Sequence, residues 1–103
     1  MTIMEEIQEK IANGQFEFSQ HAVERSITRH ISVREVSEAV MNGNLIEDYP
    51  NDKYGPSCLI YGATLAGRSL HVQCSYPSRP VLKIITVYEP DPKFWVLPNV
   101  RRN

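Results

Sequence analysis

The sequence predicts an α+β domain in which N-terminal helices pack on one face of a four-stranded antiparallel meander sheet. Helix-type periodicity with capping residues occupies about residues 2–42, and strand-type segments joined by short turns occupy about residues 45–88. Because strands with short connections pair with their chain neighbours, the strands are expected to follow chain order across the sheet. A length of 103 residues suits one hydrophobic core, so we expect a single domain with a C-terminal tail from residue 89.

The starts of three helices are marked by short hydroxyl side chains. Thr2 with Glu5, and Ser32 with Glu35, have the spacing of a capping box, in which each residue hydrogen-bonds the backbone of the other. Ser19 has the position of the N-cap of the helix between them. These residues predict three short helices before the sheet.

Extended segments follow the third helix. Alternation and turn residues predict strands over residues 45–49, 58–64, 68–75 and 81–88. Phe16 and Phe18, between the first two helices, are expected in a short extended connector. In the third strand Leu70 and Val72 alternate with His71, which is therefore expected to point away from the packed side.

The composition is that of a globular protein, with 42% hydrophobic and 22% charged residues and a net charge of −1. The acidic N-terminus lacks the features of a signal peptide, and we expect a cytoplasmic protein without a membrane-spanning segment. Acidic residues gather in residues 1–52 and basic residues in residues 53–103. This asymmetry fits a cationic surface beside an anionic one, and it equally fits helices that collect glutamate for its helix propensity.

Cys58 and Cys74 could pair across neighbouring strands, but two thiols in a cytosolic chain are more often buried and reduced. No close-spaced pair of metal ligands is present, so neither a metal nor a cofactor is expected. A site made of His21, His71 and a cysteine would require the fold to bring them together.

His21, Arg25 and Arg29 follow one another at intervals of four residues. On a helix this spacing places all three on one narrow stripe. An imidazole beside two fixed cations suits phosphate chemistry, and it also occurs on solvated helix surfaces. The other side of the helix is expected to be buried through Ala22, Val23 and Ile27.

The chain resembles a family of small bacterial proteins described only as a domain of unknown function. The resemblance covers most of residues 16–96, and its signature lies in three runs, Phe18-Ser-Gln-His-Ala-Val-Glu-Arg25, Leu70-His-Val72 and Ile84-Ile-Thr-Val-Tyr88. Three further runs match between them: Arg29-His-Ile-Ser32, Val40-Met-Asn-Gly43 and Ile46-Glu-Asp-Tyr-Pro50. That family is similar in element order to the RelE/ParE toxin superfamily of barnase/EndoU/colicin/RelE-like ribonucleases. The family usually has glycine where this chain has His30, at a helix end suited to a left-handed residue.

The resemblance implies a RelE-like fold and a toxin of a toxin–antitoxin module. Such a toxin is a metal-independent endoribonuclease that cleaves RNA through the 2′-hydroxyl and is neutralised by a cognate antitoxin. Cleavage of this kind needs a base, an acid and cations around the phosphate. His21 and His71 are the candidate acid and base, with Arg25 and Thr86 also expected to be catalytic. Substrate binding is expected from Arg29, Lys83 and Tyr88.

Each of these side chains also has a purely structural interpretation. The arginines can pair with nearby acids, while Thr86 and Tyr88 are ordinary strand formers. The alternative function is a non-catalytic interaction module or an inactive toxin relative. In that case the sheet face and residues 94–97 would form an interface for a partner protein.

Overall fold

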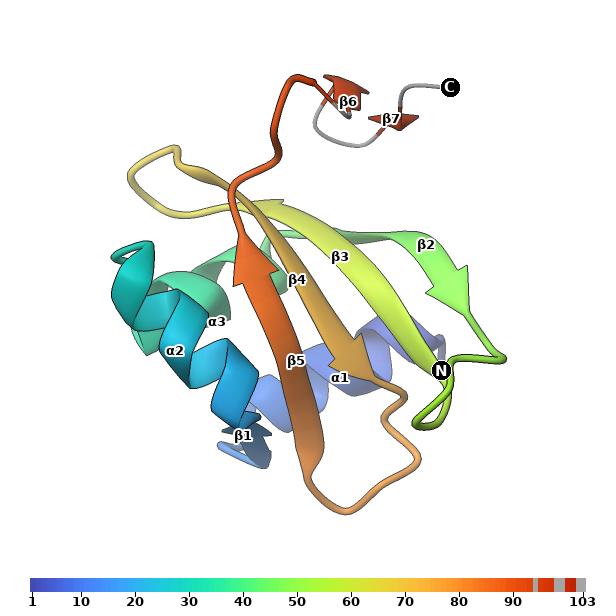
Figure 1. Cartoon of the computed structure of the whole chain (residues 1–103). Helices are drawn as coiled ribbons and strands as arrows, with labels where there is room; N and C mark the ends of the chain where they lie inside the picture. Colours follow the sequence, from blue (N-terminus) through green and yellow to red (C-terminus); the bar gives the residue numbers. More distant parts are fainter. Residues whose placement is uncertain (94, 98–99, 102–103) are drawn as a thin grey trace.

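The structure is a computed structural model that describes residues 1–93, 95–97 and 100–101. It confirms the α+β class, with three helices and one large sheet (Figure 1). The helices are α1 (Ile3–Ala12), α2 (Gln20–Thr28) and α3 (Val33–Met41). The large sheet contains β1 (Phe16–Phe18), β2 (Asn44–Tyr49), β3 (Ser57–Ala63), β4 (Ser69–Ser75) and β5 (Leu82–Tyr88). A small hairpin of β6 (Trp95–Leu97) and β7 (Val100–Arg101) lies beyond the end of β5.

The prediction of a four-stranded antiparallel meander is wrong in one respect. The strand order is β1-β5-β4-β3-β2, a mixed five-stranded sheet, because β1 pairs in parallel with β5. Phe16 lies beside Leu82 and Phe18 beside Ile84. The expected connector is thus an edge strand, and the meander holds only for β2 to β5.

All three predicted helix starts are confirmed. The side chains of Thr2 and Ser32 accept hydrogen bonds from the backbone of Glu5 and Glu35, and both glutamates return the bond. Ser19 caps α2, and its hydroxyl also donates to the carbonyl of Ile85 at 2.9 Å. This second bond ties the start of α2 to β5.

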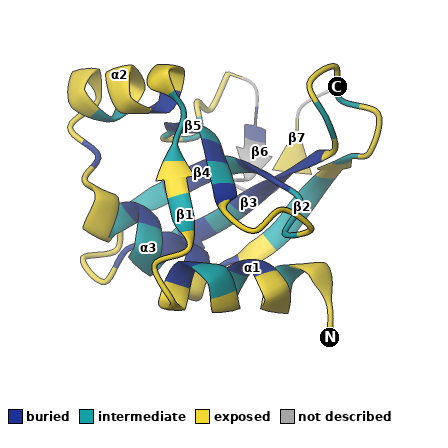
Figure 2. Ribbon diagram, turned by 90° about the horizontal axis from the view of Figure 1, so that it is seen from below, coloured by how far each residue is buried: buried dark blue, intermediate teal, exposed yellow. Residues whose placement is uncertain are grey.

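The helices do not all cover the same face of the sheet. α1 and α3 pack on one face, whereas α2 lies beside β5 and extends past the opposite face (Figure 2). Only Ala22 of α2 is buried, so the prediction of a buried face with Val23 and Ile27 is wrong: those side chains are 43% and 69% exposed. A helix at a sheet edge buries a narrower strip than a helix lying across a sheet.

A close backbone contact sets the distance between α3 and β3. A Cβ added at Gly62 would lie 1.8 Å from the carbonyl oxygen of Ala39. The absence of a side chain at Gly62 therefore allows α3 to sit directly on the sheet, where Val36 and Val40 are fully buried.

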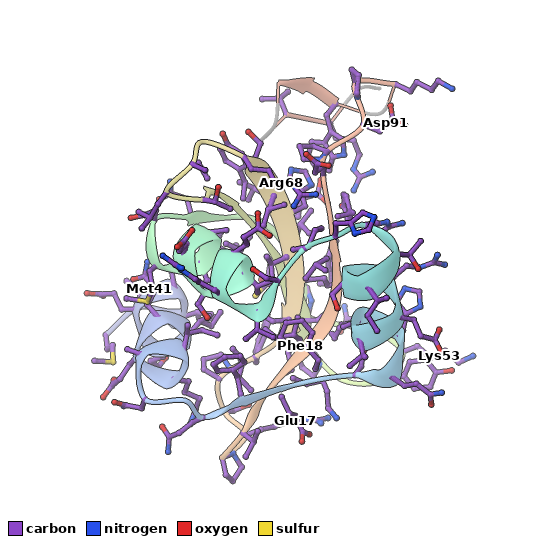
Figure 3. The ribbon with its side chains drawn as sticks, turned by 90° about the vertical axis from the view of Figure 1, so that its left-hand side faces the viewer. Glu17, Phe18, Met41, Lys53, Arg68 and Asp91 are labelled. Atoms are coloured by element: carbon purple, nitrogen blue, oxygen red, sulfur yellow. The ribbon has the colours of Figure 1, made fainter. Side chains whose placement is uncertain are left out.

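The turn between α2 and α3 is held by Arg68, which Figure 3 labels near the end of the sheet. Its guanidinium donates to the carbonyls of Arg29 and His30 at 2.9 and 2.7 Å and pairs with Glu35 and Glu89. The expected left-handed residue is found here, since His30 has a φ of 54°. No helix in the described part of the chain is long and apolar enough to cross a membrane.

Candidate functional site

Two β-bulges determine which side chains reach the sheet face opposite α1 and α3, hereafter the open face. In β5 the register shifts at Ile85, so Ile84 pairs with Cys74 on the core side while Thr86 pairs with Gln73. In β2 the shift between Leu45 and Glu47 has the same effect. Strict alternation would put Thr86 and Glu47 on the core side. The bulges turn them to the open face instead.

His71 lies on the open face, as its position in β4 predicts, but it is fully buried. Its Nδ1 is 3.2 Å from the hydroxyl of Tyr88, the residue directly opposite in β5. The ring of Trp95 from β6 packs edge-on against the imidazole at 4.4 Å between centroids. Because the C-terminal segment covers His71, a ligand on the open face would meet the Tyr88 hydroxyl before the imidazole.

A second cluster lies beside this pair. Arg101 donates two hydrogen bonds to the carboxylate of Glu47, at 3.0 and 2.9 Å, and Tyr49 donates to the same carboxylate. The guanidinium of Arg101 also stacks 4.6 Å from the ring centre of Trp95. Arg101 thus links the C-terminal hairpin to β2.

The environment shifts the acidity of these groups. The hydrogen bond from Arg101 holds the pKa of Glu47 below its ordinary value of 4.5. Burial raises the pKa of Tyr88, and burial together with the Glu47 carboxylate raises that of Tyr49. Both phenols are therefore neutral hydrogen-bond donors at neutral pH.

Three adjoining pockets follow the open face. The first, the Arg29 pocket, has a volume of about 490 Å³ and is lined by Arg29, Tyr88, Glu89, Asp91, Trp95 and Arg101. The second, the central pocket, has about 570 Å³, shares Tyr88 and Arg101 with the first, and reaches Gln73 and Asp52. The third, the Arg79 pocket, has about 240 Å³ and shares Asp52 with the second. We call the three together the candidate groove.

The predicted stripe on α2 reaches this groove at one end. Arg29 donates to the carbonyl of Val87 at 2.8 Å, and its guanidinium lies 6.0 Å from the ring centre of Tyr88. Arg25 and His21 are exposed and lie one and two turns back along the helix. Each four-residue step turns about 40° further from Arg29, so these two border the groove at most.

The remaining predicted residues lie along β5. Thr86 lies between Tyr88 and the Arg79 pocket, and it is half-buried opposite Gln73. Lys83 lines the Arg79 pocket and pairs with Glu17 at 2.8 Å. The structure therefore brings His71, Tyr88 and Arg29 together, with Thr86 nearby, but does not bring His21 and Arg25 to His71.

Cys58 and Cys74 are buried and free, with their sulfurs 3.8 Å apart on the core side, as predicted. Within the described residues no group of three or more His, Cys, Asp or Glu side chains could hold a metal ion.

Several groove residues were not predicted from the sequence: Glu47, Tyr49, Gln73, Trp95 and Arg101. The alternation in β4 that places His71 on the open face also places Gln73 there, so Gln73 could have been predicted. Glu47 depends on a bulge, and Trp95 and Arg101 depend on how the tail folds back. Phe94, the other aromatic residue of the expected tail, lies outside the described residues.

A family model, "Domain of unknown function (DUF4258)", matches residues 18–89. The chain belongs to this family. Neither the curated proteins nor the solved structures include a match. The family match ends before β6, so the segment that covers His71 lies outside the matched domain.

Proposed function

We propose that this DUF4258 protein is a cytoplasmic toxin of a toxin–antitoxin module, a metal-independent endoribonuclease of RelE-like fold that cleaves RNA through its 2′-hydroxyl. The observation that carries the proposal is the His71–Tyr88 pair, which opens onto a groove containing Arg29 and Arg101. A proton-transfer pair beside two arginines supplies the groups that this reaction needs.

The reaction can be written with these groups. Tyr88 accepts the proton of the 2′-hydroxyl while passing its own proton to Nδ1 of His71, when that nitrogen is unprotonated. The 2′-oxygen then bonds to phosphorus and the bond to the 5′-oxygen breaks, with the proton returning through Tyr88 to the leaving oxygen. The products are a 2′,3′-cyclic phosphate and a 5′-hydroxyl. Arg29 stabilises the charge on the phosphorane, and Arg101, which is already paired with Glu47, adds a weaker attraction.

The proposed residue roles differ from those predicted from the sequence. Tyr88 contacts the RNA directly, whereas His71 exchanges a proton with the Tyr88 hydroxyl and does not contact the RNA. Arg29 is a phosphate ligand, whereas Arg25 and His21 contribute to binding RNA outside the reacting centre. Thr86 and Lys83 belong to the continuation of the groove along β5.

Induced expression in a bacterial host tests the proposal. The wild type should arrest growth and fragment cellular RNA, and Tyr88→Phe should do neither, because it removes one hydroxyl and keeps the ring. Arg34→Gln is the matched control, since Arg34 pairs with Glu38 on α3 away from the groove. Harmless expression of a folded wild type would refute the toxin proposal.

A second candidate, a non-catalytic interaction module, is favoured by a separate apolar surface. Ile27 and Val33, 69% and 53% exposed, line a pocket between α2 and α3, and Val23, 43% exposed, lies one turn before Ile27 on α2. An antitoxin or another partner protein could cover these side chains. If the wild type is harmless, Ile27→Glu should abolish capture of that partner in a pull-down, whereas Tyr88→Phe should not.

A further inference from the structure

The Arg79 pocket lies at the far end of the candidate groove from His71 and is not used by the reaction described above. Its floor includes Ile85, the bulged residue of β5, and its wall includes Tyr54 from the β2–β3 loop. Figure 3 labels Lys53, the neighbour of Tyr54, on the side of the molecule that carries α2 rather than α1. The loop and α2 therefore border the same open face.

Two features suit this pocket to a nucleotide. The ring of Tyr54 is 83% exposed, with the Lys53 ammonium 5.4 Å from its centre, and it offers a surface on which a flat ligand such as a nucleobase can stack. Arg79 lines the same pocket and, within the described residues, makes no hydrogen bond or ion pair. An unengaged guanidinium beside an exposed aromatic ring matches a phosphate followed by its base.

The acidic groups of the pocket determine where the phosphate would sit. The Asp52 carboxylate accepts a hydrogen bond from the Ser57 hydroxyl at 2.6 Å and lines both this pocket and the central pocket. It would repel a phosphate in the middle of the groove. The phosphate is therefore expected near Arg79, with Lys83, already paired to Glu17, adding a weaker attraction.

The distance between the two ends fits a short single strand. Five residue steps of β5, which pass through the bulge at Ile85, separate Lys83 from Tyr88, a length of at most about 17 Å at the usual rise of a strand. A single strand lying along the open face would place a reacting phosphate at Tyr88 and a phosphate a few nucleotides away at Arg79. A duplex would not expose its base faces to Tyr54.

We propose that the Arg79 pocket, with Tyr54 and Arg79, is a remote nucleotide subsite, so that the groove takes single-stranded RNA several nucleotides long. The subsite rests on the proposed ribonuclease function. Remote contacts of this kind raise kcat/KM for a substrate long enough to reach them. A dinucleotide is too short to reach the subsite, so its kcat/KM is not raised.

A binding measurement tests the subsite without requiring cleavage. The probe is a fluorescent 2′-O-methyl hexanucleotide, which cannot be cut through its 2′-oxygen, and the readout is fluorescence anisotropy. Arg79→Gln should weaken binding about tenfold and lower the slope of log affinity against log salt by about 0.7, the loss of one phosphate contact on a single strand. Tyr54→Ala should weaken binding about tenfold, and Tyr54→Phe should restore it.

A cleavage measurement separates the subsite from the proposed function. The ratio of kcat/KM for a hexanucleotide to kcat/KM for a dinucleotide should fall about tenfold in Arg79→Gln and stay unchanged in Arg34→Gln. Cleavage with equal ratios and equal binding in wild type and Arg79→Gln would overturn the subsite and leave the ribonuclease intact. Arg79-dependent binding without cleavage would overturn the ribonuclease and leave the subsite. Absence of both binding and cleavage would overturn both.

Discussion

Tyr88 is the residue at which the buried interior meets the candidate groove. Its hydroxyl lies 3.2 Å from Nδ1 of His71, and the residue lines two of the three pockets. Burial raises its pKa, so the phenol keeps its proton in the range where the protein would act. Through the Tyr88 hydroxyl, the buried His71 can therefore exchange a proton with a ligand that it does not contact.

Arg101 and Glu47 give a prediction about acidity. Replacement of Arg101 by glutamine removes the largest cause of the lowered pKa of Glu47, so that pKa should rise toward its ordinary value of 4.5. A lowered carboxyl pKa contributes stability that is present above pH 4.5 and is lost as the pH falls through the folded-state pKa. The variant should therefore lose less stability on acidification than the wild type.

NMR titration of the Glu47 side-chain carboxyl carbon, with urea unfolding at each pH, measures both effects. Glu35 is an internal control, because its pKa is lowered mainly by the backbone of Ser32 and not by Arg101. An unchanged Glu47 titration in Arg101→Gln would mean that the bidentate pair does not form in solution.

His30 gives a prediction about backbone strain. At a φ of 54° a residue with a side chain costs about 1–2 kcal/mol relative to a right-handed conformation, and glycine avoids most of that cost. After the larger entropy that glycine loses on folding, His30→Gly should stabilise the protein by about 0.5 kcal/mol. Urea unfolding measures the change.

The matched control is His21→Gly, which introduces the same residue at a helical position of α2. It should destabilise the protein by about 0.5–1 kcal/mol. Equal destabilisation by both substitutions would show that the turn after α2 is not left-handed.

At the scale of elements, the sequence predicts the starts and types of the elements well where the signal is local. The capping residues of all three helices and the four strands of the meander agree with the structure to within one or two residues. β1 was missed as a strand because three residues carry little alternation, and its partner Leu82–Tyr88 lies more than sixty residues away. The exposure of Ile27 was not predicted, because an amphipathic helix pattern does not show how much of the apolar side of the helix the sheet will cover.

The same limit applies to the candidate site. Alternation along β4 predicts the side of His71 correctly, because that strand has no bulge before Gln73. It fails for Glu47, because one extra residue in β2 reverses the alternation. The contribution of Trp95 and Arg101 depends on a long-range return of the tail, which no local pattern encodes.

The contact between α3 and β3 gives a prediction at this scale. Gly62→Ala would drive a methyl group into the carbonyl of Ala39, so α3 must move off the sheet. We expect a loss of at least about 2 kcal/mol of unfolding free energy, at the upper part of the range for overpacked sites. Denaturant unfolding followed by circular dichroism measures this loss.

Gly14→Ala provides the control, since a Cβ there has no atom within 4 Å and meets only the cost of a φ of 69°. That cost should be about 1 kcal/mol. A Gly62→Ala protein no less stable than Gly14→Ala would contradict the close packing of α3 on β3.

At the scale of the whole molecule, the two faces of the sheet have different roles. One face packs on α1 and α3 and forms the core (Figure 2). The open face carries the candidate groove, whose Arg79 pocket is lined by Ser19 at the start of α2 and by residues of the β2–β3 loop. The hairpin of β6 and β7 closes one end of that groove over His71. Basic side chains line both ends of the groove. Arg29 and Arg101 lie at the end near His71, and Arg79 and Lys83 lie at the opposite end.

The most direct test of this arrangement is cleavage of a short RNA by the purified protein in EDTA. The wild type should cut it to 2′,3′-cyclic phosphate and 5′-hydroxyl ends and should leave the 2′-deoxy oligonucleotide of the same sequence intact. Tyr88→Phe should slow cleavage at least about 100-fold, the usual contribution of a proton-transfer group, while Arg34→Gln should match the wild type. A folded wild type that cuts neither oligonucleotide, or cuts both equally, would contradict the proposed ribonuclease.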